Sequence, residues 1–168
     1  MPDRPPPASR DTAMHERFIA ETIRLAAQNV RDGRGGPFGA VVVKDGEVIA
    51  TGTNLVTATH DPTAHAEVMA IRAACRALGS HQLTGCDIYA SCEPCPMCLA
   101  AIYWARPERL FFAATREDAA AVGFDDSLIY EQIPLPCAER SLATRRIAHP
   151  DRLRPLQAWT AEPGRTDY

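Results

Sequence analysis

The spacing of apolar residues predicts an amphipathic helix near the N-terminus. Within residues 12–31, apolar and small side chains recur three and four positions apart, which places them on one face of a helix. These residues are Phe18, Ile19, Thr22, Ile23, Ala26 and Val30. Thr12 suits the N-cap of this helix, and the glycines and proline of "DGRGGPFG" end it.

The next segments alternate between short apolar runs and a second helical pattern. "AVVVKDGEVIATG" contains two apolar runs joined at Asp45-Gly46, which predicts a β-hairpin. A polar loop, "TNLVTATHDPT", follows it. Within residues 64–78 apolar side chains then recur at helical spacing, and Gly79 ends the helix. These side chains are Val68, Ile71, Cys75 and Leu78.

The remaining pattern predicts a three-layer α/β domain. "CDIYAS" and "RLFFAAT" are typical of strands, and "CPMCLAAIYWA" between them is typical of a buried helix. The order strand, strand, helix, strand, helix, strand favours helices on both faces of one sheet. We expect a disordered leader over residues 1–11, a single domain over residues 12–133 and an appended C-terminal segment over residues 134–168.

Composition narrows the classes of function. The 168 residues are 46% apolar and 23% charged, which is typical of a soluble domain. No apolar run reaches the roughly 18–20 residues that span a bilayer, and "MPDRPPPASRD" lacks the apolar segment of a secretory signal. A net charge of -3 argues against broad attraction to phosphate backbones. We therefore expect a cytoplasmic protein without a membrane or nucleic-acid partner.

Six cysteines without a secretion signal favour metal binding or redox chemistry over disulfides. Cys75, Cys86 and Cys137 stand apart, and we interpret each as a buried or half-buried small apolar residue. We interpret Cys92 as a packing residue. The histidines without neighbouring candidate ligands are expected on the surface or in loops; they are His15, His60, His81 and His149.

Cys95 and Cys98 form a C-x-x-C pair at the start of a predicted helix. On a helix their sulfur atoms lie about 60° apart on one edge. Pro94 and Pro96 suit a first helical turn, whose free amides favour thiolate over thiol. By itself this geometry serves either a redox disulfide or two metal ligands.

His65-Ala66-Glu67 opens the other predicted helix and supplies the missing ligand. A second C-x-x-C is absent from the sequence, which disfavours a structural four-cysteine site. Two thiolates and one imidazole leave a fourth position for water, the arrangement of catalytic zinc. H-x-E followed by P-C-x-x-C is also the pattern of zinc deaminases. We predict that His65, Cys95 and Cys98 hold one Zn²⁺ and that Glu67 shuttles protons.

Four blocks, covering roughly residues 13–133, resemble the small bacterial guanine deaminases of the cytidine-deaminase-like zinc superfamily. The blocks are "GGPFGAVVVKDG", "DPTAHAEVMAIRAAC", "SCEPCPMCLAAIYWARP" and "GFDDSLIY". The zinc blocks are shared with tRNA adenosine, cytosine and riboflavin-pathway deaminases, so "GFDDSLIY" and the terminal tyrosine carry the finer assignment. The resemblance implies an α/β/α fold with a mixed sheet of about five strands.

The resemblance further implies hydrolysis of guanine to xanthine and ammonia. It implies that Asn54 reads the polar edge of the base, that Phe38 stacks on the purine, and that Asp126 lies near the departing amino group. Ala66 joins the substrate-binding residues, and Tyr168 would close the pocket. From the residues alone, other interpretations stay open: Asp126 as a helix cap or surface residue, Asn54 as a turn residue, and Phe38 as core packing.

The resemblance also implies homodimers in which the C-terminal segment crosses to the partner. From the residues alone, this segment can close the active site of its own subunit or that of the partner. Trp104 is interpreted as a core or interface residue. Two rival functions remain: a tRNA adenosine or cytosine deaminase of the same superfamily, and a non-catalytic zinc-binding module. A purely structural module would have no need of Glu67, so this residue separates it from an enzyme.

Overall fold

The computed structural model describes residues 10–167. Residues 1–9 of the expected leader and the proposed pocket-closing Tyr168 lie outside the described residues. The chain divides into two compact units, one ending at Asp126 and the other beginning at Ser127. No helix within the described residues combines the length and the apolar character needed to cross a membrane.

The first unit is built on a mixed sheet with strand order β2-β1-β3-β4. The strands are β1 Gly39–Lys44, β2 Glu47–Thr53, β3 Cys86–Cys92 and β4 Arg109–Ala114. Strand β1 runs antiparallel to both neighbours, whereas β3 and β4 are parallel. The mixed sheet is confirmed, although residues 10–167 form four strands where the resemblance implied about five.

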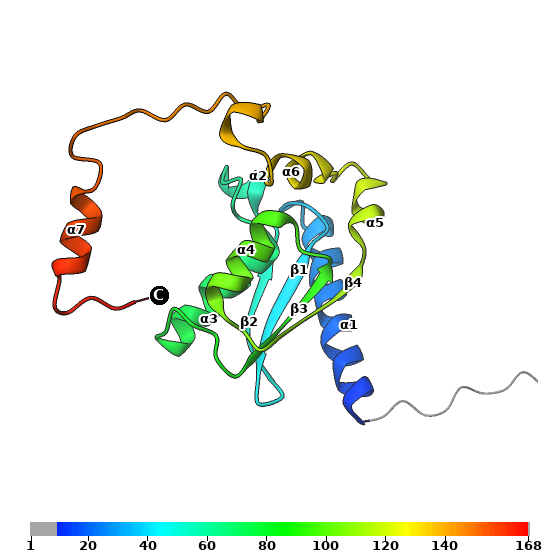
Figure 1. The fold of residues 1–168 in the computed structure, drawn as a ribbon. Coiled ribbons are helices and arrows are strands. Elements are labelled where there is room, and N and C mark those ends of the chain that lie inside the picture. Colours follow the sequence, from blue (N-terminus) through cyan, green and yellow to red (C-terminus); the bar gives the residue numbers. More distant parts are fainter. Residues whose placement is uncertain (1–9, 168) are drawn as a thin grey trace, which may run out of the picture. The chain divides into compact units, whose positions relative to one another are not determined.

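Helices cover both faces of this sheet, as Figure 1 shows. Helix α1, Arg10–Arg31, packs on one face against β1 and β3. Helices α3, Ala66–Leu78, and α4, Pro96–Ala105, contact each other, and α3 packs against β1 and β2. The predicted three-layer α/β/α architecture is therefore confirmed.

The uninterrupted apolar run of β1 is explained by burial on both faces. Ala40 and Val42 belong to the core cluster shared with α3 and α4. Val41 and Val43 belong to a second cluster, which contains Phe18 of α1. Since successive strand residues point to opposite faces, a central strand covered on both sides needs apolar residues at every position.

Helix α1 presents a different face to the sheet from the one predicted. Its buried stripe contains Phe18, Thr22, Ala26 and Asn29. Ile23 is 49% exposed and Val30 is 51% exposed, so placing these two on the buried face was wrong. Thr12 lies inside the helix, which begins at Arg10, so the expected cap was also wrong. The apolar pattern alone did not reveal that a polar residue, Asn29, faces the core.

The connections follow their local sequence signals closely. The hairpin turns at Asp45 and Gly46, whose φ values of 51° and 79° suit a two-residue turn. Helix α3 ends at Gly79 with a φ of 61°. One difference lies in the expected polar loop, where Val56–Thr59 forms the short helix α2.

Strand β2 and helix α3 approach each other closely at Gly52. A Cβ atom at Gly52 would overlap the carbonyl oxygen of Ala66 and crowd the backbone of Ala70. The deepest α3 positions are accordingly the small residues Ala66, Ala70 and Ala74, while the larger predicted core residues pack at the edge of the cluster. This contact fixes the first turn of α3, where His65 and Glu67 lie.

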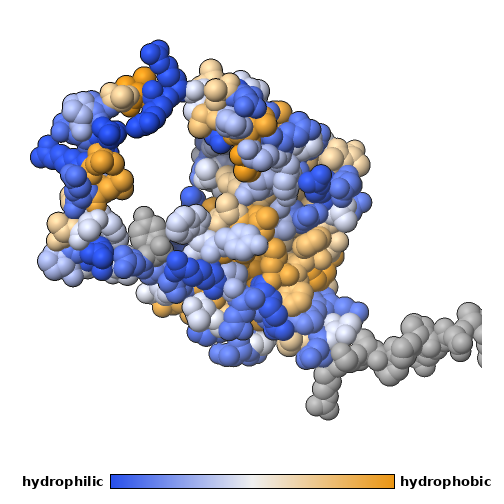
Figure 2. Space-filling view, viewed as in Figure 1, coloured by the Kyte–Doolittle hydropathy of each residue, from blue (hydrophilic) through white to orange (hydrophobic). Residues whose placement is uncertain are grey.

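The second unit, described by itself, consists of short helices joined by extended chain. They are α6 Ser127–Gln132, the 3-10 helix η1 Cys137–Glu139 and α7 Arg154–Ala161. Leu156 is 63% exposed and Trp159 is 43% exposed on α7, and Figure 2 shows apolar side chains on the outside of this helix. Cys137 is exposed, so its interpretation as a buried residue was wrong.

Cysteines and histidines of the first unit that lie apart from the predicted ligands form hydrogen bonds that the sequence did not reveal. Cys86 and Cys92 are buried and Cys75 is half-buried, as predicted, and the Cys92 thiol donates to the Thr115 carbonyl at 3.4 Å. His15 was predicted as a surface residue, but its Nδ1 lies 2.7 Å from the Tyr89 hydroxyl. Its place on the sheet side of α1 explains the difference.

Candidate metal centre

Two helix N-termini bring the three predicted ligands together. His65 caps α3 and Cys95 caps α4, both with extended backbone, and Cys98 lies in the first turn of α4. His65 Nδ1 lies 3.5 Å from the Sγ atom of each cysteine. All three ligand atoms lie within 4.8 Å of one another. The positive ends of both helices point to this cluster and favour thiolate ligands.

The geometry of the cluster fits zinc. A tetrahedral Zn²⁺ with bonds of about 2.3 Å to sulfur and about 2.0–2.1 Å to nitrogen places these atoms about 3.6 Å apart. The observed separations of 3.5 Å match this requirement. Within residues 10–167, no fourth histidine, cysteine or carboxylate completes the cluster. Three ligands and an open position characterise a catalytic zinc site.

Hydrogen bonds between the ligands shift the pKa values of all three side chains. The thiol of Cys98 donates to Cys95 and, together with His65, lowers the pKa of Cys95 to about 4. The same hydrogen bond, followed by burial, raises the pKa of Cys98. The hydrogen bond with Cys95 also raises the pKa of His65. A divalent cation would displace the shared protons, because only thiolate and neutral imidazole coordinate it.

Glu67 is a carboxyl group in an unusual environment beside the cluster. It is 7% exposed, and it is the one charged residue that is buried among the side chains the structure describes. Burial raises the pKa of Glu67, and this desolvation is the largest influence on its carboxyl group. A carboxyl group whose pKa lies above its ordinary value can take up and release a proton closer to neutral pH, as a general acid and base must.

Asn54 has one end of its amide group occupied and the other end available. It is 6% exposed. Its Oδ1 accepts hydrogen bonds from the backbone N–H groups of Gly36 and Val56, both at 3.3 Å. Because both partners are donors, the oxygen must face them, and Nδ2 is the atom left to donate to a ligand. The residue therefore organises the turn and also offers a donor.

Phe38 and Asp126 belong to the same compact unit as the ligand cluster. Phe38 is half-buried, packs against the core, and meets the ring of Phe124 edge-on at 4.9 Å between centroids. Burial, followed by the negative charge of Cys95, raises the pKa of the half-buried Asp126. Asp126 therefore feels the charge of one of the predicted metal ligands.

Ala66 contributes its methyl group to the core and not to the site. Its side chain is fully buried in the cluster under the sheet. Its backbone N–H belongs to the first turn of α3, where amides have no intrahelical acceptor. Any contact of Ala66 with a substrate would therefore be made by this N–H group.

Comparison with known proteins places the three predicted metal ligands and Glu67 within a region that matches one family. Residues 12–114 match the model of the cytidine and deoxycytidylate deaminase zinc-binding region. The guanine deaminase of Bacillus subtilis (strain 168) is 53% identical over 154 residues, which cover 92% of this chain and 99% of the relative. The X-ray structure of guanine deaminase from Bacillus subtilis superposes with a TM-score of 0.90 and covers 92% of this chain.

Other relatives share a shorter region. A tRNA-specific adenosine deaminase of Aquifex aeolicus is 42% identical over 99 residues, 59% of this chain and 65% of the relative. A structure of guanine deaminase from Nitrosomonas europaea is 35% identical, with a TM-score of 0.63, and covers 66% of this chain and 64% of that chain. The longest of these similarities thus extends well beyond the zinc-binding region.

Proposed function

Since this chain belongs to the cytidine and deoxycytidylate deaminase zinc-binding family, we propose that it is a zinc-dependent guanine deaminase, which hydrolyses guanine to xanthine and ammonia. The observation that carries the choice of guanine is the extent of the similarity: 53% identity to a guanine deaminase continues over 92% of the chain. The tRNA-specific relative covers 59% of the chain. Zinc is the cofactor, in agreement with the family and with the donor set.

The chemistry divides between the metal and the protein. Zinc, when bound by His65, Cys95 and Cys98, supplies a Lewis acid that lowers the pKa of water at its open position. Glu67 accepts a proton from the attacking water, delivers it to a ring nitrogen and carries a proton to the departing amine. The water oxygen bonds to C2 of guanine, the bond between C2 and the amino nitrogen breaks, and a carbonyl replaces the amine.

The remaining residues of the site bind and orient the base. Asn54 Nδ2 donates to an acceptor on the purine edge, since its Oδ1 is already bound. Phe38 offers an aromatic face or edge to the flat ring. The N–H of Ala66 donates from the first turn of α3. Asp126 accepts a hydrogen bond from the amino group of guanine and assists the departure of ammonia.

Replacing Asp126 with asparagine is expected to lower kcat for guanine by about 100-fold, the low end of general acid–base contributions. The amide keeps the size of the side chain but cannot hold a proton on oxygen or carry the charge. Ammonia release and zinc content are measured together, with Asp125→Asn as the neighbouring control. Zinc should be retained in both variants, and full activity of Asp126→Asn would remove this residue from the site.

The proposed substrate is tested by ammonia release from the zinc-loaded protein. Guanine, adenine, cytosine, cytidine, guanosine and a tRNA anticodon stem-loop are offered side by side. We expect turnover confined to guanine. Turnover of adenosine in the stem-loop would favour the tRNA deaminase instead, and silence on every substrate would favour a non-catalytic module.

The chemistry of the site supports a proposal for the compartment. All six cysteines are free, and Cys95 and Cys98 bind zinc only as reduced thiolates. Disulfides form and persist in oxidising compartments, whereas the cytoplasm keeps thiols reduced. We therefore place this enzyme in the cytoplasm.

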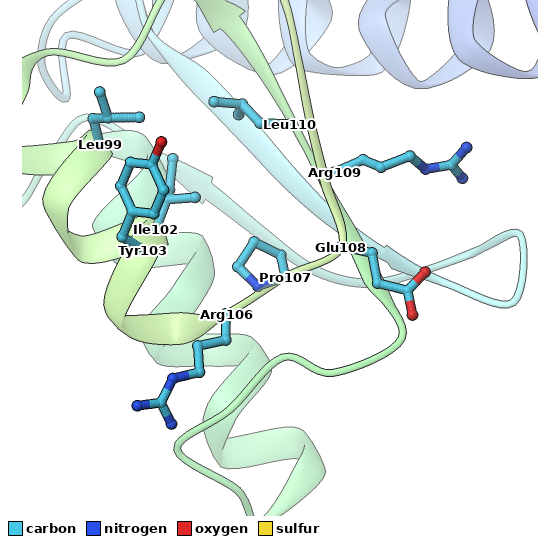
Figure 3. A pocket seen from close by; sticks show the side chains of 8 residues that line it. All are labelled: Leu99, Ile102, Tyr103, Arg106, Pro107, Glu108, Arg109 and Leu110. Atoms are coloured by element: carbon cyan, nitrogen blue, oxygen red, sulfur yellow. The ribbon is translucent and has the colours of Figure 1, made fainter.

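A second copy of the chain is the proposed partner, and it packs on the outer side of α4. There Tyr103 is 76% exposed and Trp104 is 63% exposed, so the core interpretation of Trp104 was wrong. Beside them a hollow of about 310 Å³ lies between α4 and β4 (Figure 3), and Figure 2 shows apolar side chains gathered there. Its rim carries Arg106 and Glu108. Opposite charges on one patch suit a two-fold interface, in which the patch meets itself.

We further propose that residues 134–168 close the active site of the partner copy. Exposed apolar side chains support this proposal. Leu153 at the N-cap of α7 is 48% exposed and Leu156 within the helix is 63% exposed, so both are available to pack against another surface. Ending the chain at Ala158 is expected to lower kcat/KM for guanine about tenfold or more, since an open site admits water and loosens substrate positioning. Light scattering should give the intact protein twice the mass of one chain. Wild-type rates in the shortened chain would overturn the closing role.

A further inference from the structure

Asn29 is a buried polar residue on α1 that the proposed reaction does not use directly. It is 2% exposed. Its Nδ2 donates to two backbone carbonyls, that of Asn54 at 2.8 Å and that of Gly36 at 3.0 Å. Both partners can only accept hydrogen bonds, so the nitrogen and not the oxygen of the amide must face them. The side chain therefore joins α1 to two other segments.

These two segments carry the proposed substrate-binding residues. Gly36 lies two residues before Phe38, and its N–H donates to Asn54 Oδ1 at 3.3 Å. The N–H of Asn54 donates to the carbonyl of Phe38 at 3.1 Å. At Gly35 a Cβ atom would overlap the Asn54 carbonyl oxygen, so the two backbones are in direct contact. Asn29 donates to the same carbonyl from the α1 side.

The position of Asn29 is costly for folding alone. Its Oδ1 is buried and has no hydrogen-bond partner within the described residues. A buried amide oxygen without a partner destabilises the folded state, whereas Nδ2 satisfies the carbonyls of Asn54 and Gly36. The other residues of the buried α1 stripe, Phe18, Thr22 and Ala26, leave no such atom. The contribution of Asn29 thus comes from the two bonds that Nδ2 donates, which fix the Asn54 and Gly36 segments against α1.

We propose that Asn29 is a positioning residue for the substrate: it holds the backbone of Asn54 against the Gly36 segment, so that the Asn54 amide nitrogen faces the base. This inference rests on the proposed function. The zinc ligands His65, Cys95 and Cys98 belong to α3 and α4, and none of them is hydrogen-bonded to Asn29. Losing Asn29 should therefore weaken guanine binding and leave the metal in place.

A double-mutant cycle tests whether Asn29 acts through Asn54. Guanine binding is measured by equilibrium dialysis of labelled guanine against zinc-loaded protein carrying Glu67→Ala, which prevents turnover. Asn29→Leu should raise the dissociation constant about tenfold, and Asn54→Ala at least as much, as expected for one lost hydrogen bond. The double variant should bind no more weakly than Asn54→Ala alone, because residues acting as one unit are not additive.

Matched variants separate positioning from general destabilisation. Thr22→Val also removes a buried hydrogen bond from α1, the one to the Ile19 carbonyl at 2.7 Å, but touches neither substrate segment. It should leave guanine binding unchanged. Asn29→Gln keeps the amide and should bind guanine more tightly than Asn29→Leu. If the leucine variant fails to fold, the glutamine variant still tests the positioning role. Zinc content and the thermal midpoint are recorded for each.

The outcomes distinguish this inference from the proposed function. Ammonia release from guanine by the unmodified protein tests the function separately. Suppose that the unmodified protein turns over guanine. The positioning role alone is then overturned if the increases in dissociation constant caused by the Asn29 and Asn54 variants multiply in the double variant. It is also overturned if Asn29→Leu and Asn29→Gln both bind guanine as tightly as their parent. A protein that leaves guanine intact would overturn both.

Discussion

Replacing Glu67 with alanine is expected to lower kcat for guanine by about 10³- to 10⁴-fold, the upper range for general acid–base catalysis. Glu67 is buried beside the ligand cluster, and burial raises the pKa of its carboxyl group. Without it, the site loses the carboxyl group that transfers protons between the water, the ring nitrogen and the leaving amine. Zinc content should stay at one ion per chain, since Glu67 is not in the ligand set.

A near-isosteric variant makes the Glu67 prediction specific. Glu67→Gln keeps the volume and the hydrogen-bonding capacity but cannot shuttle a proton, so it should lose as much activity as Glu67→Ala. Turnover is followed by ammonia release under substrate saturation, and zinc by atomic emission. Substantial activity in the glutamine variant would exclude the proton-shuttle role. Unchanged zinc content in both variants, with no guanine turnover by the unmodified protein, would instead favour a structural zinc module.

Replacing Cys98 with serine is expected to remove zinc and activity together. Cys98 is fully buried, and its Sγ lies 3.5 Å from His65 Nδ1, the separation that a shared zinc ion requires. A serine hydroxyl remains protonated at neutral pH and is a poor ligand, so two ligands would be left. Loss of a Lewis acid worth several kcal/mol should reduce the rate by about 10³-fold or more. Treating the unmodified protein with a chelator should have the same effect.

Cys92 supplies the matched control for Cys98. It is also a buried thiol, three residues before Cys95, but its Sγ donates to the Thr115 carbonyl and lies outside the ligand set. Cys92→Ala should keep zinc and most of the activity. If Cys92→Ala lost the metal while Cys98→Ser kept it, the ligand set would be wrong. Zinc per chain and the thermal midpoint report on both variants.

The local parts of the site could be predicted from the sequence because their geometry is local. The spacing of Cys95 and Cys98 places both sulfurs on one edge of a first helical turn, whatever surrounds it. The same holds for His65 and Glu67 at the start of α3, and for the turn at Asp45. Two cysteines and one histidine leave one coordination position of a zinc ion open, so the sequence also predicted a catalytic and not a structural zinc site.

Which residues face one another was decided only by the tertiary structure. His65 and Cys95 are far apart in the chain and meet because the N-termini of α3 and α4 converge at one end of the sheet. The burial of Asn29 and the exposure of Val30 depend on how α1 lies on β1 and β3, which side-chain hydropathy did not reveal.

The sequence by itself determined the ligand types, their helical turns, the reaction class and the layered architecture. It did so because residue chemistry and short-range periodicity act within a few residues of the chain. The burial that shifts the pKa of Glu67, the orientation of Asn54 and its support by Asn29 were decided only by the tertiary structure. The physical reason is that desolvation and long-range hydrogen bonds arise from neighbours distant in sequence, which are brought together only when the sheet and its helices pack.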